Sequence, residues 1–186
     1  MKLFIKNMVC NRCKMVVKTE LEQLGFNPVA VHLGEVEIKP EMLDAVQTET
    51  IKQALSKFGF ELLTDKKKQL AEQIKTTIIE LVHYPSKALK VNLSSYLSDK
   101  LRLEYANLSA VFSEVEQQTI EKYFILQKIE KVKELLTYDE KSLSEIAYFL
   151  NYSSVAHLSA QFKKVTGQTP SVYKQTASGR KTLDQI

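Results

Sequence analysis

An internal repeat is the feature of this chain that most constrains its fold. The segment 106–123, ANLSAVFSEVEQQTIEKY, matches the segment 156–173, AHLSAQFKKVTGQTPSVY, at an offset of 50 residues. Two copies of one helical unit, separated by a long helix over about 119–137, predict two similar small modules held at a fixed separation. The identical pairs are Ala106/Ala156, Leu108/Leu158, Ser109/Ser159, Ala110/Ala160, Phe112/Phe162, Val115/Val165, Gln118/Gln168, Thr119/Thr169 and Tyr123/Tyr173.

The second copy has the capping and turn residues of a helix-turn-helix. Ser142 and Glu145 have capping-box spacing at the start of the helix LSEIAYFL. The following NYSS is a tight turn in which Ser153 or Ser154 caps a second helix, and Gly167 ends that helix. The predicted inward positions are Ile146, Ala147 and Leu150 in the first helix and Leu158, Phe162 and Val165 in the second.

These residues resemble a known family of DNA-binding proteins. The stretch SLSEIAYFLNYSS…HLSAQFKKVTGQTPSVYK (142–174) is similar to the second helix-turn-helix of the AraC/XylS transcription regulators, through its Phe-Lys-Lys, Thr-Gly and Thr-Pro positions and its closing Tyr. The resemblance covers roughly 88–175, because that family also joins two such units by a long helix. It implies sequence-specific binding of double-stranded DNA. At about 1.5 Å per residue the joining helix is roughly 28 Å long, comparable to the roughly 34 Å between successive major-groove faces.

The resemblance also implies which side chains face DNA. Since most of these positions hold small or apolar residues, we expect readout through thymine methyl groups and close backbone approach. The first unit has Glu114 and Glu116 where the second has Lys164 and Thr166, so we expect one strong and one weak half. The implied DNA-binding positions are Ser154, Val155, Ala156, Ser159, Ala160, Lys163 and Lys164 in the second unit and Tyr105, Ala106, Ser109 and Ala110 in the first.

Residues 1–64 have the periodicities of a small α+β domain. Their order is strand (2–8), helix, a hairpin formed by VAVHL and EVEI around Gly34, helix, and a last strand FELL. That order is the ferredoxin-like βαββαβ arrangement. The predicted fold class is therefore α+β, with a ferredoxin-like domain followed by an all-α double helix-turn-helix domain. The predicted inward residues are Val29, Val31, Leu33, Val36 and Ile38 in the hairpin, Val17, Leu21 and Leu24 in the first helix, and Ile51, Ala54, Leu55 and Phe58 in the second.

The segment KNMVCNRCKMVV contains the two cysteines of the chain, Cys10 and Cys13. It resembles the loop after the first strand of heavy-metal-associated domains, in which Met8 would precede the Cys-x-x-Cys and Asn7 stands where glycine is usual. Two thiolates at a helix start suit Cu(I) or another soft ion, whereas Zn(II) would need further ligands. A thiol redox pair, and a fold retained only for dimerisation or another ligand, are the alternatives.

The run TDKKKQ (64–69) is the best candidate for a domain boundary. Beyond it an amphipathic stripe extends to Pro85, and this stripe fits packing on the C-terminal domain, bridging of the two domains, or pairing with a second chain. A homodimer through the N-terminal domain or this connector helix is one expectation. The stripe consists of Leu70, Ile74, Ile78 and Leu81. The predicted divisions are a domain at 1–64, a connector at 65–87, a DNA-binding domain at 88–176 and a tail at 177–186.

Charge alone does not identify a partner. The formal net charge is +4, and residues 1–64 hold eight basic and eight acidic side chains, so the excess lies C-terminal to them. No run approaches the roughly 18 to 20 apolar residues of a membrane span, and no signal peptide is recognisable, so we expect a cytoplasmic protein that does not use a membrane. We expect no enzyme, because the sequence has no carboxylate pair, Ser-His-Asp set or phosphate-binding glycine loop.

The sequence therefore predicts a DNA-binding transcription regulator that responds to a soft metal or to thiol state. The alternative is a metal-trafficking protein whose C-terminal helices dock a protein partner and do not bind DNA. A separate interpretation of the repeat is that it is only a helical core. Salt dependence separates the two, because phosphate contacts make the logarithm of duplex affinity fall with the logarithm of salt concentration.

Overall fold

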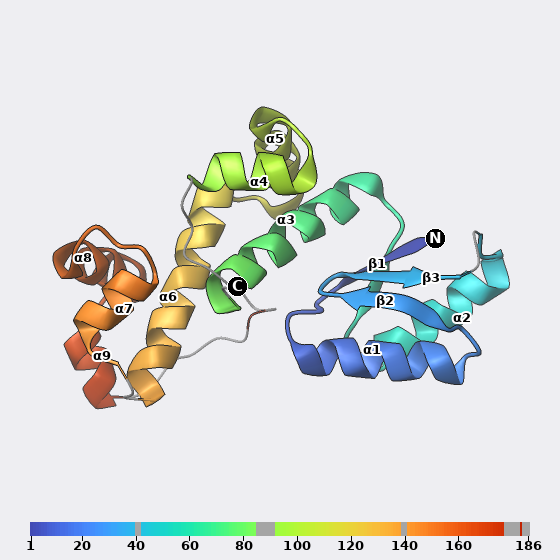
Figure 1. The fold of residues 1–186 in the computed structure, drawn as a ribbon, viewed down its shortest axis with the longest axis horizontal. Coiled ribbons are helices and arrows are strands. Elements are labelled where there is room, and N and C mark those ends of the chain that lie inside the picture. Colours follow the sequence, from blue (N-terminus) through green and yellow to red (C-terminus); the bar gives the residue numbers. More distant parts are fainter. Residues whose placement is uncertain (40–41, 85–91, 139–140, 177–182, 184–186) are drawn as a thin grey trace.

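A small sheet with two helices precedes a group of seven helices in the computed structural model (Figure 1), which describes residues 1–39, 42–84, 92–138, 141–176 and 183. Pro85 and all but one residue of the predicted tail 177–186 lie outside these ranges. The N-terminal elements are β1 (Lys2–Lys6), α1 (Asn11–Gln23), β2 (Pro28–His32), β3 (Glu35–Ile38), α2 (Ala45–Ser56) and β4 (Glu61–Leu63). The helices that follow are α3 (Lys66–His83), α4 (Leu93–Leu101), α5 (Tyr105–Glu116), α6 (Ile120–Tyr138), α7 (Leu143–Phe149), α8 (Val155–Thr166) and α9 (Pro170–Thr176).

The sheet is antiparallel with strand order β2-β3-β1-β4, and its elements follow the predicted βαββαβ order. Alternation in β1 and β3 gives one buried face, on which Ile5 and Val36 are fully inaccessible to solvent. Val17 and Leu21 of α1 and Ile51 of α2 close the same cluster. The predicted inward positions of these helices and of β3 are therefore confirmed, apart from Phe58.

Two apolar residues lie outside this core, contrary to the expectation. Val29 is 60% exposed because β2 has a register shift between Pro28 and Ala30, which takes Val29 out of the alternation. Phe58 is 50% exposed because α2 ends at Ser56, so helical spacing no longer applies to it, and the chain turns at Gly59. The buried aromatic side chain of this turn is Phe60.

Helix α3 lies between the sheet and the other helices (Figure 1). Its residues Ala71, Ile74 and Ile78 are fully buried in the cluster that also contains the repeat residues. Two buried polar residues of α3, Glu72 and Thr76, contact the sheet domain instead. Leu70, Ile74 and Ile78 of the stripe thus pack on the helical domain, while the helix bridges both domains of one chain. Pairing with a second chain and the exact domain boundaries stay predictions.

The repeat is a structural repeat. Leu108 and Phe112 of α5, like Leu158 and Phe162 of α8, have no solvent exposure. Each phenylalanine meets the last tyrosine of its repeat, with ring centroids 5.6 Å apart for Phe112 and Tyr123 and 5.5 Å apart for Phe162 and Tyr173. Val165 was expected in this stripe but is 38% exposed, since α8 ends one residue later and the Phe162–Tyr173 pair already closes the core.

The ends of α7 and α8 show the predicted capping. The Ser142 side chain accepts the Glu145 N–H and the Glu145 carboxylate accepts the Ser142 N–H, which completes the capping box. Ser154 caps α8, since its Oγ accepts the backbone N–H of His157 at 3.0 Å. Gly167 ends α8 with φ of 81°, in the left-handed region.

Candidate nucleic-acid interface

The outward face of α8 contains most of the predicted positions of the second unit. Ala156, Ala160, Lys163 and Lys164 are exposed, with Ser154 exposed at the cap, and Ser159 is half-buried. Val155 is also half-buried, and it packs against the core. Only part of the Val155 side chain is therefore accessible, and its contact with DNA stays a prediction.

The outward face of α5 is similar, with one difference. Ala106 and Ala110 are exposed, and Ser109 is half-buried. Tyr105 is half-buried against the core and its hydroxyl donates a hydrogen bond to the Glu121 carboxylate on α6. Burial and this carboxylate raise the pKa of Tyr105. Tyr105 therefore fastens α5 to α6, instead of lying free on the outer face as expected.

Sequence reasoning missed two polar residues on these faces, Asn107 and His157. Both are exposed, and they occupy equivalent positions in the two repeats. The His157 ring lies edge-on to Tyr152, at 5.4 Å between centroids, and its Nδ1 is 3.0 Å from Ser153 Oγ. The sequence does contain a signal for them: Asn107 and His157 directly follow Ala106 and Ala156, so they lie on the same outward face of their helices.

The acidic residues of the first unit are paired with lysines of α3. Lys67 Nζ lies 2.6 and 2.8 Å from the two carboxylate oxygens of Glu114. Lys75 Nζ is 3.5 Å from Glu116 Oε2. The negative charge of α5 is therefore offset by a neighbouring helix, whereas α8 supplies its own lysines.

Lys128 of α6 supports the turn of the second unit. Its Nζ lies 3.7 Å from the centroid of the Tyr152 ring and 5.4 Å from that of Phe124, and the residue is 9% exposed. Burial lowers the pKa of Lys128 to about 8. The Tyr152 hydroxyl donates to Gln161 Oε1 at 2.7 Å, so Tyr152 links α6 to α8. The orientation of α8 on α6 thus depends on a buried lysine.

The thiol pair lies at the start of α1, remote in sequence from the helix-turn-helix units. Cys10 is the N-cap residue, Cys13 lies in the first turn, and their sulfur atoms are 3.2 Å apart. Burial opposes ionisation of Cys10, but hydrogen bonds from Cys13 and the Arg12 backbone, with the Arg12 charge, lower its pKa. Burial and the hydrogen bond with Cys10 raise the pKa of Cys13. One thiol is thus prepared to ionise before the other.

Met8 and His32 are not positioned to complete a metal site with the thiols. Met8 is fully buried in the sheet-domain core, and His32 is an exposed strand residue. Among the described residues no group of three or more His, Cys, Asp and Glu side chains could hold a metal ion. Any ion at this loop would therefore depend on Cys10 and Cys13.

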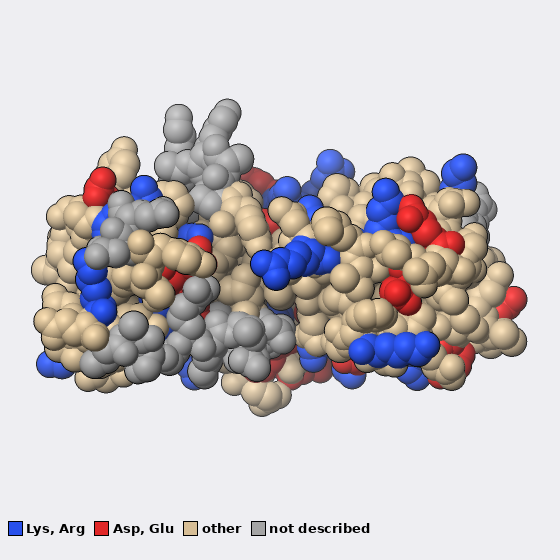
Figure 2. All heavy atoms as spheres, turned by 90° about the horizontal axis from the view of Figure 1, so that it is seen from below, with Lys and Arg blue, Asp and Glu red and all other residues tan. Residues whose placement is uncertain are grey.

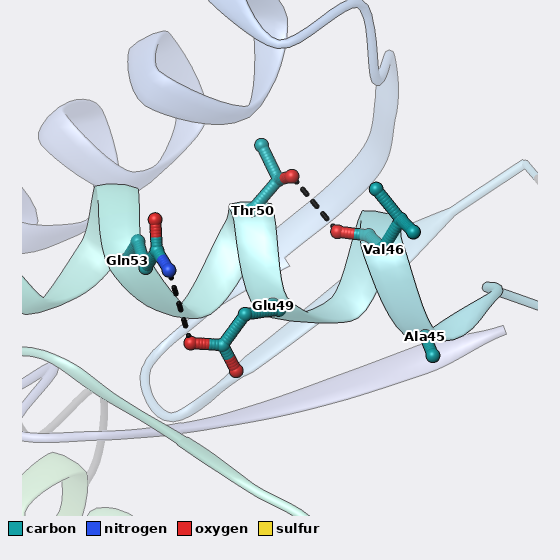
Figure 3. A pocket seen from close by; sticks show the side chains of 5 residues that line it. All are labelled: Ala45, Val46, Glu49, Thr50 and Gln53. Atoms are coloured by element: carbon teal, nitrogen blue, oxygen red, sulfur yellow. Dashed lines mark hydrogen bonds between the residues drawn. The ribbon is translucent and has the colours of Figure 1, made fainter.

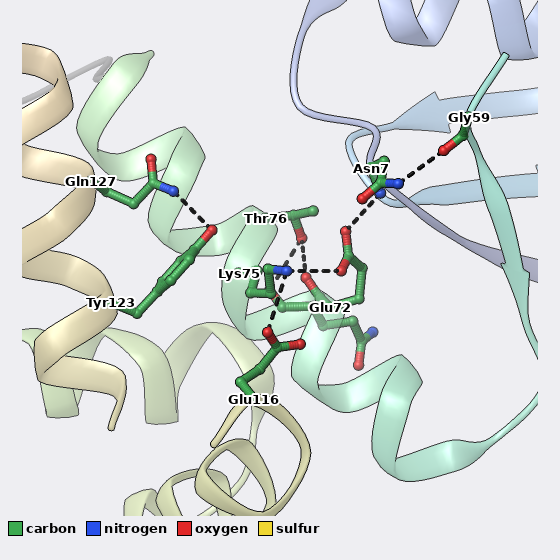
Figure 4. A network of polar contacts seen from close by, with 9 residues as sticks. Asn7, Gly59, Glu72, Lys75, Thr76, Glu116, Tyr123 and Gln127 are labelled. Atoms are coloured by element: carbon green, nitrogen blue, oxygen red, sulfur yellow. Dashed lines mark hydrogen bonds and ion pairs between the residues drawn. The ribbon is translucent and has the colours of Figure 1, made fainter. Parts of the chain in front are cut away.

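Figure 4 shows that the loop before α1 contacts α3. Asn7 has φ of 72°, a left-handed conformation that suits the glycine usual at this position, and its Nδ2 donates to the Gly59 carbonyl at 2.8 Å. Its backbone N–H donates to Glu72 Oε1 at 3.3 Å. Lys75 Nζ lies 3.9 Å from Glu72 Oε2 and pairs with Glu116 of α5. Burial raises the pKa of Glu72, so this carboxylate depends on its few polar partners.

The loop has a second contact at the other end of α3. The Tyr84 hydroxyl donates to the Val9 carbonyl at 3.3 Å, one residue before Cys10. Burial raises the pKa of Tyr84, and nearby Cys10, Glu134 and Cys13 raise it further. The thiol loop is therefore in contact with the C-terminal end of a helix that belongs to the helix-turn-helix core.

A shallow depression lies on the outer side of α2 (Figure 3). All of its lining residues come from this one helix. Their polar groups bond within the helix, since Thr50 Oγ1 donates to the Val46 carbonyl at 2.8 Å and Gln53 Nε2 donates to Glu49 Oε1 at 3.2 Å. Since no second element converges here, the depression lacks the features of a ligand site. The lining residues are Ala45, Val46, Glu49, Thr50 and Gln53.

On the face drawn in Figure 2, charge is not separated by domain. Figure 2 shows basic and acidic side chains interspersed over the sheet domain and the helices on the face it presents. Of the helices in the described ranges, none is long and apolar enough to cross a membrane. An interface must therefore be identified from local geometry.

Comparison with known sequences points to the helical part of the chain. Residues 97–176 match a family model described as a helix-turn-helix domain. The xylose operon regulatory protein of Escherichia coli strain K12 is 29% identical over 105 residues, which are 54% of this chain and 26% of that protein. The protein of the same name from Escherichia coli O157:H7 has the same identity and coverage. The chain thus spans about a quarter of the length of the curated relatives it matches.

Solved structures show the same fold. The C-terminal domain of AraT, a response regulator from Geobacillus stearothermophilus, superposes with a TM-score of 0.51 at 22% identity, covering 60% of this chain and 88% of that chain. A DNA-binding transcriptional dual regulator from Escherichia coli K-12 gives 0.50 at 18% identity, covering 58% and 91%. At these identities the likeness is one of fold. Together with the two repeated helical units, the comparisons support a helix-turn-helix domain over residues 97–176.

Proposed function

We propose that this chain regulates transcription by binding a specific DNA sequence, with α5 and α8 each in a major groove. The observation that supports this most is the duplicated outward face. Ala106 and Ala110 of α5 recur as Ala156 and Ala160 of α8, with the polar residues Asn107 and His157 at equivalent exposed positions, and both faces lie over a buried Leu and Phe. The two helices are separated by α6, whose 19 residues span roughly 28 Å at about 1.5 Å each.

The side chains on these faces fit a particular kind of readout. Alanines let the helix backbone approach the base edges closely and contact thymine methyl groups. An amide such as Asn107 can pair with adenine through two hydrogen bonds, and His157 offers a ring nitrogen at the equivalent place. Lys163 and Lys164 lie at the end of α8, where they would contact phosphates. The DNA-contacting roles of the predicted residues are part of this proposal.

Selection from a randomised duplex pool tests the proposal. We expect an enriched site with two parts about one helical turn of DNA apart. An Ala160→Glu variant should lose the enrichment, because it places a carboxylate against the DNA. Gln53→Glu, on the outer side of α2, is the matched control with the same added charge. A pool without enrichment for the parent chain would contradict DNA reading and favour the alternative role of docking a partner in metal trafficking.

We propose further that DNA binding is controlled by Cys10 and Cys13, through a bound soft metal ion or through oxidation of the two thiols. Their donor set fits an ion that accepts two thiolates, Cu(I) first, and does not fit a complete Zn(II) site. The βαββαβ order with Cys-x-x-Cys after β1 supports a ferredoxin-like, heavy-metal-associated-like domain. The contact from Val9 to Tyr84 gives a route from this loop to α3, and α3 shares the core of the first unit.

This regulation is tested by DNA affinity of the reduced protein with and without Cu(I), and after treatment with oxidised glutathione, which would take two electrons and two protons from the thiols. Binding of Cu(I) itself is measured separately by competition with a chromogenic chelator. We expect the affinity to change in at least one arm, and Tyr84→Phe to diminish the change without altering Cu(I) binding. Cys10→Ser/Cys13→Ser should abolish it. An affinity indifferent to both treatments would refute this regulation.

A further inference from the structure

We propose that Lys66 and Lys68, at the start of α3, contact the DNA backbone beside the first helix-turn-helix unit, while Lys67 between them neutralises Glu114 of that unit. The inference rests on the proposed DNA binding and adds a contact surface that lies outside both repeats. It gives a function to the basic segment TDKKKQ (64–69), which the sequence analysis identified only as a candidate domain boundary.

The first reason is an imbalance between the two repeats. The last turn of α8 has Lys163 and Lys164, both exposed. The last turn of α5 has no basic residue, and Glu114 occupies the position equivalent to Lys164. A unit that presents a carboxylate where its twin presents an ammonium group needs positive charge from another element to approach phosphates.

The second reason is the position of Lys67. Its ammonium group bonds both oxygens of Glu114, at 2.6 and 2.8 Å. Glu114 lies four and eight residues after Ala110 and Ala106, on the same exposed stripe of α5. The ion pair therefore brings the start of α3 to the edge of the face that we assign to DNA.

The third reason is that the neighbouring lysines extend this charge. Lys66 and Lys68 are exposed, and α3 begins here because the Asp65 side chain accepts the Lys68 N–H at 2.9 Å. Lys67 neutralises Glu114, and its two neighbours are placed to meet phosphates. Three lysines on one turn thus substitute for the basic end that α5 lacks.

Salt titrations of DNA binding test the surface with matched variants of the full chain. Each lost phosphate contact should reduce the slope of log affinity against log salt by about 0.9. For Lys66→Gln/Lys68→Gln the change in Kd between 50 and 200 mM salt should therefore be about tenfold smaller than for the parent. The control Lys18→Gln/Lys57→Gln removes the same charge from exposed positions of the sheet domain and should keep the parental slope. Equal slopes for the two double variants would overturn the proposal.

Glu114→Gln provides a test that structural damage would not imitate. It releases Lys67 from its ion pair, so we expect several-fold tighter DNA binding and a slope steeper by about one contact. Glu49→Gln, which breaks the Lys52 pair on α2, is the control and should leave affinity unchanged. Unchanged or weaker binding by Glu114→Gln would refute the surface. If the parent chain binds no duplex, the proposed function fails as well; if it binds while these variants match their controls, only this surface is wrong.

Discussion

Lys128 offers a sharp test of the packing between α6 and α8. Methionine has a similar length and no charge, so it suits a buried position on α6. Lys128→Met therefore keeps an apolar stem between Phe124 and Tyr152 while removing a buried ammonium group. Removal of this charge should stabilise the fold.

The magnitude follows from the pKa of Lys128, which burial lowers from 10.5 to about 8. At about 1.36 kcal/mol per pKa unit, burial of the charge costs about 3 kcal/mol at neutral pH. The Tyr152 ring returns up to about 2 kcal/mol through the cation–π contact, and partial solvation of the ammonium group offsets more. The net gain for Lys128→Met is about 1–2 kcal/mol, which raises Tm by about 2–8 °C in a chain of this size.

The pH dependence gives the sign of the effect. The unfolded chain retains the Lys128 proton up to about pH 10.5, whereas the folded chain loses it near pH 8. Stability of the parent relative to Lys128→Met should therefore rise as pH increases from about 8 to 10.5, and fall back as pH decreases through 8.

Urea denaturation of both proteins at pH 7 and pH 9.5 measures this difference directly. We expect the unfolding free energy of Lys128→Met to exceed that of the parent by the whole of this amount at pH 7 and by less at pH 9.5. A less stable Lys128→Met protein would show that the contact with Tyr152 outweighs the desolvation of the charge. A gap that is constant with pH would show that Lys128 is not buried as described.

Two further substitutions test the contacts that orient helices. Ser142→Ala should lower the unfolding free energy by about 1 kcal/mol in urea denaturation, because it removes the capping box of α7, whereas exposed Ser144→Ala should not. Gly34→Ala places a Cβ 2.7 Å from the Thr76 methyl group at φ of +71°, and should cost about 1–3 kcal/mol by the same assay. Gly25→Ala, with φ of +83° and open space around it, shares only the backbone strain, so an equal loss would argue against the contact with α3.

Local patterns predicted much of the fold. Each of the following features depends on residues close in sequence and lies where expected: the capping box at Ser142, the end of α8 at Gly167, and the buried side chains of Leu158 and Phe162. Val29 was misplaced because a bulge is set by pairing between strands, which spacing along one strand does not reveal.

The features that sequence could not supply depend on tertiary neighbours. Lys128 is a residue type expected at the surface, and only the packing of α6 against the Tyr152 turn buries it. The Lys67–Glu114 pair joins positions 47 residues apart, so nothing local to either residue indicates it. Spacing along α8 likewise indicated the exposed positions Ala156 and Ala160, but it could not show that Val155 packs partly against the core.

Helix α3 couples the stability of the sheet domain to that of the first helix-turn-helix unit. Ala71 and Ile78 contribute to the core of the first unit, while Glu72 and Thr76 on the same helix are buried against the sheet domain. Unfolding of either the sheet domain or the first unit would expose one face of α3 to solvent, and would thereby destabilise the part still packed on the other face. The sheet domain and the first unit should consequently melt in one cooperative transition, and the second unit, which reaches them through α6, is the part free to open by itself.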